Sequence, residues 1–319
     1  MCDGCRCSGE ADEKPHRRMS RLNRQQILGW SAVGLSTALT CLWAFWGIIE
    51  NFHEGWYQPT LLGNLSLMLG QYLIAMIVFL AFALIGLKWP KIGGALHVIF
   101  GCSLPVWFIR NNAGALFLSL PMVVLGILYW FGNPEPRKWA YRAVIAVPLA
   151  VLLVSGAEPA WRVSRRIDDG NPGARIVNGN GLQLVFAPRG PGWPESGVSW
   201  RQAMDICSHL SADGKTVSDS ALNIWHLPNA DELVRCATRG NANCGGVWDS
   251  VLHVATYHVT PDKESPLWDT HSAVIYWWTS TTPSDSTALI YVYNGALYPR
   301  LKGIKPGYLA FRAVRPNNN

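Results

Sequence analysis

Five long apolar runs fill the first half of this 319-residue chain and restrict its fold more than any other feature. They lie at residues 27–49, 61–87, 92–109, 114–131 and 139–157. An α-helix needs roughly 20 apolar residues to cross the hydrocarbon core of a bilayer. A buried soluble core would need polar faces and turn signals between the runs, and the sequence lacks them. We therefore predict a five-helix transmembrane domain at residues 27–157, preceded by a tail at residues 1–26.

The positive charge is concentrated around these runs and predicts their orientation. Up to Ala157 there are 12 Lys/Arg against 7 Asp/Glu, and beyond it 15 against 14. The tail and the loops at 88–91 and 137–138 are basic, whereas the loop at 50–60 has no Lys or Arg. Cytoplasmic loops carry such an excess. The pattern predicts an integral protein of an inner or plasma membrane, with a cytoplasmic N-terminus, an exterior C-terminal half, membrane lipid as a partner and no nucleic-acid partner.

Three polar side chains lie within the predicted spans, namely Asn64, Gln71 and His97. An ionisable residue inside a membrane is a functional candidate, which makes His97 the strongest of the three. The alternative is that His97 bonds to a neighbouring helix and serves packing. No second histidine at helical spacing indicates haem or metal, and no series of acids and bases indicates a proton relay.

Six of the eight cysteines fall into a cytoplasmic and an exterior group, and Cys41 and Cys102 lie inside apolar runs, where we interpret them as packing residues. Cys2, Cys5 and Cys7 open the tail, where they are one ligand short of a complete zinc site unless His16 joins them. We interpret the tail as disordered instead.

In the exterior half, an oxidising compartment permits disulfides. Cys236 and Cys244 are the preferred pair because they are close in sequence, across a turn that contains glycine. A bond from Cys207 to either of them remains open.

The exterior half begins with a polar linker at residues 158–175 and continues as a domain at 176–319. Ser199 with Gln202, and Asn229 with Glu232, have the spacing of capping boxes, which predict two helix starts. We expect the second helix to end near Gly240. Strands are predicted at 182–186, 274–278, 288–293 and 308–315, with a tight hairpin turn at Asn294-Gly295.

The order of several motifs in this half resembles a known family. The motifs are Trp225-His226-Leu227-Pro228, Asp231-Glu232-Leu233, the stretch Tyr276–Thr281, Asn294-Gly295 and the stretch Phe311–Arg315. Over residues 176–316 they resemble the Lcl C-terminal domain family, which is related to formylglycine-generating enzyme domains. The resemblance implies an α+β C-type-lectin-like exterior domain. The chain departs from the family pattern at His226, where Arg is usual, and at Ala313, where Cys is usual.

The resemblance and the many aromatic residues favour a non-catalytic binding or structural module of the cell envelope. Its ligand would be a glycan or an envelope protein. We predict the ligand-binding residues to be Trp248, His253, Trp268, His271 and Trp278. We nominate no catalytic residue, no metal site and no cofactor.

Other interpretations stay open. The helices themselves could act as a sensor or a small transporter. A formylglycine-generating-type enzyme would need cysteines late in the domain, and the chain has none after Cys244. Asp262, Glu264 and Asp269 have oxygen ligands suitable for calcium, but we interpret them as solvated loop acids.

Overall fold

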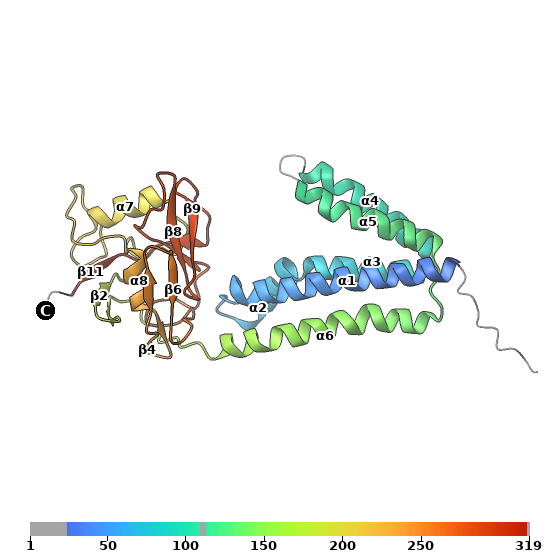
Figure 1. The fold of residues 1–319 in the computed structure, drawn as a ribbon, viewed down its shortest axis with the longest axis horizontal. Coiled ribbons are helices and arrows are strands. Elements are labelled where there is room, and N and C mark those ends of the chain that lie inside the picture. Colours follow the sequence, from blue (N-terminus) through green and yellow to red (C-terminus); the bar gives the residue numbers. More distant parts are fainter. Residues whose placement is uncertain (1–23, 109–112, 318–319) are drawn as a thin grey trace, which may run out of the picture. The chain divides into compact units, whose positions relative to one another are not determined.

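The computed structural model describes residues 24–108 and 113–317, with side chains except at 107–108 and 113–118. Helices make up the first half of the described chain and short strands dominate the second (Figure 1). The chain divides into two units, Met1–Thr40 with Val78–Val147 and Cys41–Ile77 with Pro148–Asn319. The boundaries fall inside three helices. The second unit therefore contains the C-terminal parts of two of these helices together with the whole strand-rich domain.

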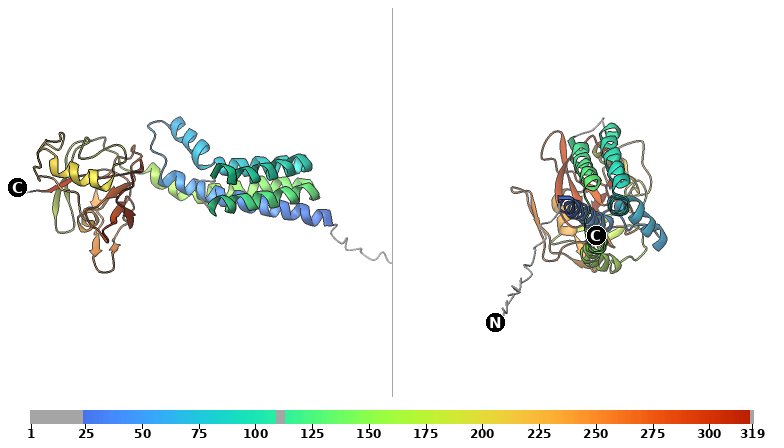
Figure 2. Two further views of the ribbon diagram at one scale, coloured as in Figure 1. Left: turned by 90° about the horizontal axis from the view of Figure 1, so that it is seen from above. Right: turned by 90° about the vertical axis from the view of Figure 1, so that its right-hand side faces the viewer.

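The helical half follows the apolar runs of the sequence. Its elements are α1 (Arg24–His53), α2 (Leu61–Leu67), the π-helix η1 (Met68–Tyr72), α3 (Ile74–Lys88), α4 (Pro90–Phe108), α5 (Ala113–Phe131) and α6 (Arg137–Ser164). In the first unit, α4 and α5 lie side by side (Figures 1 and 2). Gly93 of α4 sits against Gly86 of α3, where a Cβ atom would collide with the Gly86 backbone.

Two helices of the described chain, α1 and α6, are long and apolar enough to cross a membrane as single helices. A third span would need α2 and η1 to act together with α3, but these parts are bent by 63°. Neither α4 nor the apolar stretch Ser119–Phe131 of α5 meets the same requirement. The prediction of five spans is therefore not confirmed. Within the second apolar run, at residues 61–87, the helix breaks at Leu73, where φ is −98° and ψ is 1°.

The strand-rich domain contains two main sheets and two short hairpins. The first sheet has the order β1 (Arg175–Asn178), β2 (Gln183–Phe186), β11 (Val314–Pro316). The second has the order β10 (Leu309–Ala310), β7 (Tyr276–Trp278), β8 (Thr287–Val292), β9 (Leu297–Leu301). The hairpins are β3 (Thr238–Arg239) with β4 (Ala242–Asn243), and β5 (Val247–Asp249) with β6 (Val254–Thr256). The predicted strand at 308–315 is in fact two strands, one in each main sheet.

The predicted turns and helix starts are present. Asn294-Gly295 joins the antiparallel strands β8 and β9, and Gly295 has a φ of +87°. Ser199 and Asn229 cap α7 (Trp200–His209) and α8 (Ala230–Cys236) in complete capping boxes. However, α8 ends at Cys236 and not near Gly240, because Ala237 is extended and leads directly into β3.

His226 supports the cap of α8 by contacting the capping residue Glu232. Its backbone pairs with Val314 of β11, and its Nε2 lies 2.9 Å from Oε1 of Glu232. The other carboxylate oxygen of Glu232 accepts the backbone N–H of Asn229. His226 is therefore a partner of the capping glutamate.

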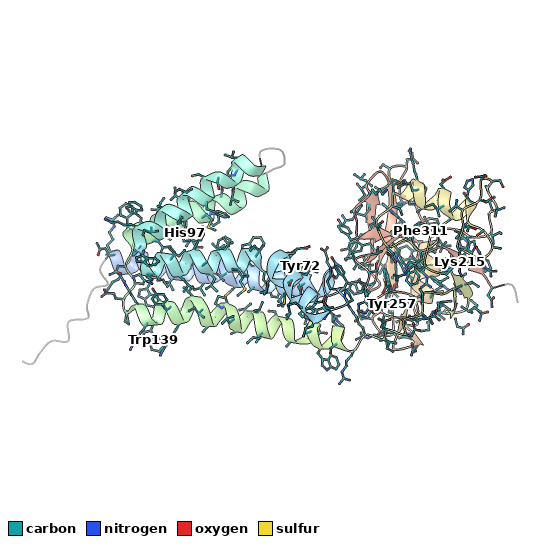
Figure 3. All side chains as sticks on the ribbon, turned by 180° about the vertical axis from the view of Figure 1, so that it is seen from behind. Tyr72, His97, Trp139, Lys215, Tyr257 and Phe311 are labelled. Atoms are coloured by element: carbon teal, nitrogen blue, oxygen red, sulfur yellow. The ribbon has the colours of Figure 1, made fainter. Side chains whose placement is uncertain are left out.

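Aromatic side chains fill the core on both faces of the second sheet. Trp277 and Trp278 are neighbours on β7 and are both fully buried, so they point to opposite faces. Trp277 packs in one core cluster with Trp268, and their rings are stacked at 3.9 Å. Trp278 packs in the other cluster with Phe311, which is labelled in Figure 3. Apolar burial on both faces thus fixes the position of β7.

Candidate functional site

The five residues predicted to bind a ligand fall into three places. Trp268 and His271 line one cavity. Trp248 and His253 lie on the β5–β6 hairpin, with ring centroids 6.0 Å apart. Trp278 is buried, and its Nε1 donates to the carbonyl oxygen of Val198 at 2.8 Å. Trp278 is therefore a core residue, and this burial speaks against its predicted role as a ligand contact.

The cavity at Trp268 and His271 has a volume of about 310 Å³. Three segments that are far apart in the sequence form its walls. They contribute Asp168, Gly170, Asn171 and Pro172 from the stretch after α6, Arg189 and Trp193 from the loop after β2, and Ser265, Trp268, Asp269 and His271 from the stretch before β7. Trp193 and Trp268 supply apolar wall, and Asp168, Asn171, Arg189, Ser265, Asp269 and His271 supply side-chain hydrogen-bonding groups.

Short turns built on aspartate shape the rim of this cavity. The backbone N–H of Gly170 donates to Asp168 Oδ1 at 2.9 Å, and that of His271 donates to Asp269 Oδ1 at 2.8 Å. Aspartate favours such turns because its side chain satisfies a backbone donor two residues on. Gly170 has a φ of +62°, which glycine adopts without steric cost. The rim is thus preformed by local sequence.

Charged groups on the rim are paired across the three segments. His271 Nε2 lies 3.1 Å from Asp168 Oδ2. Arg189 contacts Asp269 and also lies 2.8 Å from Glu195. The cavity therefore presents polar groups of both signs, and no single charge dominates it.

Arg312 bonds to all three segments that form the walls, and its contact with the stretch after α6 is the carbonyl oxygen of Gly173 at 3.4 Å. It is fully buried, and it donates to the carbonyl oxygens of Ala187 at 2.9 Å and Leu267 at 2.6 Å. Its guanidinium lies 3.7 Å from the ring centroid of Trp193. A planar guanidinium suits both tasks, because it stacks on the aromatic ring while it donates in the plane.

A second cavity, of about 340 Å³, meets the first at Asp168 and His271. It is lined by Trp56, Gln58, Pro59, Thr60, Leu61 and Asn64 from the stretch before and within α2, by Val163 and Arg166, and by Thr270. The Asp168–His271 pair therefore has a cavity on either side.

The stretch predicted as a linker is attached to the domain. Helix α6 continues to Ser164, and Arg166 then donates through Nε to Asp262 Oδ1 at 3.0 Å. The N–H of Ile167 donates to Glu264 Oε2 at 3.0 Å, and Ile167 accepts from Ser265 at 2.9 Å. The residues after α6 are thus bonded to the stretch 262–265, which brings Asp168 to the cavity.

His53, the last residue of α1, makes another attachment. Its Nδ1 lies 2.8 Å from the hydroxyl of Tyr293, and its Nε2 lies 3.3 Å from the hydroxyl of Tyr276. Two helix ends of the second unit therefore contact the strand-rich domain directly.

The acids weighed as calcium ligands already have partners. Asp262 and Glu264 are 3% and 4% exposed, so they are not solvated loop acids. Asp262 pairs with Arg166, Glu264 accepts backbone N–H groups of Ile167 and Gly240, and Asp269 pairs with Arg189. Within residues 24–108 and 113–317, no group of three or more His, Cys, Asp or Glu is arranged to hold a metal ion.

Lys263 lies between these acids and is 1% exposed. Its Nζ donates to the carbonyl oxygen of Ser272. Burial, reinforced by the charge of Arg166, lowers the pKa of the Lys263 amine to about 7. Nothing in the sequence around Lys263 indicates that this amine is buried.

The cysteines of the domain are free thiols in the structure. Cys207, Cys236 and Cys244 are all buried, and no disulfide joins Cys236 to Cys244. Cys236 faces Gly179 beside β1, whereas Cys244 follows β4. Burial raises the pKa of Cys236 to about 12 and that of Cys244 to about 11. Both thiols are therefore protonated at neutral pH. The tail cysteines and His16 lie outside the described residues.

His97 is fully buried in the first unit. Figure 3 labels it among the helices. Its Nδ1 lies 2.8 Å from the carbonyl oxygen of Gly93, and its ring stacks on Tyr129 at 5.3 Å. Its other nitrogen, Nε2, has no hydrogen-bond partner among the described residues. The contacts are those of a packing residue.

Sequence reasoning missed the walls that Asp168, Asn171, Arg189 and Trp193 provide. The stretches 168–173 and 188–197 show only turn signals, which say where the chain bends and not what it lies against. No family model matches the chain, and neither a curated protein nor a solved structure matches it. The resemblance to the Lcl C-terminal domain family therefore stays a prediction.

Proposed function

We propose that this chain is a membrane-anchored binding protein whose strand-rich domain lies outside the membrane and holds a glycan or another envelope component. The cavity between Trp193, Trp268 and His271 is the proposed binding site. The single observation that supports it most is the composition of the cavity, with two tryptophans in its wall and paired polar groups at its rim. Binding sites commonly combine apolar walls with a few placed polar groups.

The proposed orientation requires an odd number of spans, because crossing by α1 and α6 alone would leave both ends of the chain on the same side. If α1, the bent pair and α6 cross the membrane, the count is three. If α4 and α5 cross as well, the count is five. Both odd numbers place the strand-rich domain opposite the N-terminus, and the basic residues around 88–91 and 137–138 favour the cytoplasmic side for those loops.

The topology can be tested with reporters fused after Asn133 and after Asn319. The proposal expects a cytoplasmic signal from the first fusion and an exterior signal from the second. A cytoplasmic signal from the fusion after Asn319 would rule out an exterior domain.

Ligand binding can be tested with the full chain in detergent on a glycan array and against envelope extracts. His271→Ala and Asn171→Ala each remove a rim group, and we expect a loss of about three- to tenfold in affinity, since one hydrogen bond contributes roughly 0.5–1.5 kcal/mol. His253→Ala on the β5–β6 hairpin is the matched control and should bind normally. Equal losses in all three variants would move the site away from this cavity.

A further inference from the structure

The C-terminal part of α1 forms a third, separate cavity with the π-helix η1. It has a volume of about 420 Å³. Trp43, Trp46 and Glu50 line it from α1, Glu54 lines it from the turn directly after α1, and Gln71 and Tyr72 line it from η1. Trp43, Trp46, Glu50 and Glu54 follow one another at intervals of three, four and four residues. This spacing places all four on one side of the helix axis.

Close backbone contact between the two helices fixes this arrangement. A Cβ atom at Gly47 would collide with the carbonyl oxygen of Tyr72, so the residue at position 47 must be glycine. The wider turn of the π-helix ends at Tyr72, which is labelled in Figure 3. Single π-helical turns are frequent at functional sites.

The two carboxylates of this cavity are without a counter-charge. Among the residues that the structure describes, neither Glu50 nor Glu54 forms an ion pair, although both are only partly exposed. The described lining contains no Lys, Arg or His. Burial raises the pKa of the Glu54 carboxyl. A partly desolvated anion of this kind gains free energy when a cation comes beside it.

The lining is poorly suited to a hard metal ion. Calcium takes six to eight oxygen ligands, and two glutamates with one glutamine fall short of that number. The aromatic rings point to a different cation. Trp and Tyr faces attract organic ammonium groups through the quadrupole of the ring, and a carboxylate beside them adds direct charge attraction.

We propose that the cavity formed by Trp43, Trp46, Glu50, Glu54 and Tyr72 binds an organic ammonium cation. The cation is either the headgroup of an aminophospholipid or a free amine, since both present the same group to the rings and carboxylates. The headgroup source rests on the proposed membrane location of α1, and the free-amine source does not. Neither depends on the exterior cavity at His271.

The test uses the full chain in nanodiscs of phosphatidylglycerol, which has no ammonium headgroup. Choline chloride is titrated by calorimetry, with sodium chloride held constant. We expect saturable binding to the unchanged protein and at least an about tenfold loss in the double variant Glu50→Gln/Glu54→Gln, since each tenfold change corresponds to roughly 1.4 kcal/mol. Trp46→Leu keeps an apolar side chain but removes the ring, and it should also weaken binding.

Two matched variants serve as controls. Glu158→Gln changes an exposed acid of α6, and Trp130→Leu changes an exposed tryptophan of α5. Both should bind choline normally, and thermal unfolding without choline should show that all variants are folded. The proposal is overturned if choline does not saturate, or if Glu50→Gln/Glu54→Gln binds as tightly as the unchanged chain.

A second set of nanodiscs contains phosphatidylethanolamine. Weaker apparent choline binding in these discs identifies the lipid headgroup as a competing occupant, whereas unchanged binding identifies a free amine. Failure of this site would leave the glycan-array result at His271 untouched, so the two proposals are tested separately.

Discussion

Partly or fully buried acids occur in two regions of this protein, and their surroundings differ. In the strand-rich domain, Asp262 lies 2.9 Å from Arg166, and Glu264 accepts backbone N–H groups. Asp269 contacts Arg189. At the end of α1, by contrast, Glu50 and Glu54 lie beside aromatic rings with no ion-pair partner in the described chain.

The difference separates structural acids from acids that are available to a ligand. A buried carboxylate costs free energy unless charges and hydrogen bonds compensate for it. In the strand-rich domain the protein supplies that compensation from its own residues, and the result is attachment of the stretch after α6. At the end of α1 the compensation is left to solvent or to a bound cation.

The strongest test of this contrast is Asp262→Ala. It leaves Arg166, whose side chain is 5% exposed, without its carboxylate. Breaking one side of a buried ion pair typically costs about 3–5 kcal/mol. Chemical denaturation of the full chain in detergent, followed by tryptophan fluorescence, measures the loss. A cost below about 1 kcal/mol, the range of surface pairs, would show that Asp262 is not a structural acid.

The tryptophans of the two regions should differ in the same way. Trp278→Ala removes a fully buried ring and its hydrogen bond to Val198, and we expect a loss of about 3–5 kcal/mol in unfolding free energy. Trp46 is 56% exposed. Its replacement by Ala should change stability by less than about 1 kcal/mol, as for most surface positions. Comparable losses from both variants would contradict the assignment of Trp46 to a ligand cavity.

Lys263 predicts a pH dependence of the strand-rich domain. Its folded-state pKa of about 7 lies below the ordinary value of 10.5, so the unfolded state binds more protons between these values. Stability should therefore rise with pH from about 7 to 10.5, by at most about 1.4 kcal/mol per pH unit. Unfolding free energies at several pH values measure this slope.

Lys263→Met is the comparison, because it removes the titrating amine and keeps an unbranched side chain. The slope of the unchanged chain should exceed that of the variant over this range. Identical slopes would show that the amine is not held neutral by burial.

Glu54→Gln should have the smallest effect on stability. It removes a charge that has no ion-pair partner in the described chain, so in choline-free buffer we expect a change of at most about 1 kcal/mol, as for most surface substitutions. Added choline should stabilise the unchanged chain more than the variant, because a ligand stabilises the state that binds it. Equal choline effects on the melting temperature would remove Glu54 from the proposed cation site.

The buried thiols Cys236 and Cys244 should not react with an alkylating reagent while the chain is folded. Because burial raises the pKa of Cys236 and Cys244, iodoacetamide at pH 8 should modify them only after denaturation. Mass spectrometry of the non-reduced protein should find both as free thiols. A Cys236–Cys244 crosslink would restore the disulfide expected from their spacing.

The sequence by itself determined the local elements of this protein. Ser199 with Gln202 and Asn229 with Glu232 specify two helix starts, and Asn294-Gly295 specifies a hairpin, because caps and tight turns depend on residues within a few positions of each other. The apolar runs likewise predict helices, since each helix satisfies its own backbone hydrogen bonds.

Tertiary structure alone decided which of these residues meet. Trp268 and Trp278 look alike in the sequence and are both buried, yet only Trp268 borders the cavity, because it lies in the stretch before β7 whereas Trp278 lies on β7 within the second core cluster. The stretch after α6 reads as a linker, but Asp262 and Glu264, almost 100 residues later, bind it to the domain. The break at Leu73 and the unpaired acids at Glu50 and Glu54 arise in the same way, because they depend on contacts between helices that no local pattern encodes.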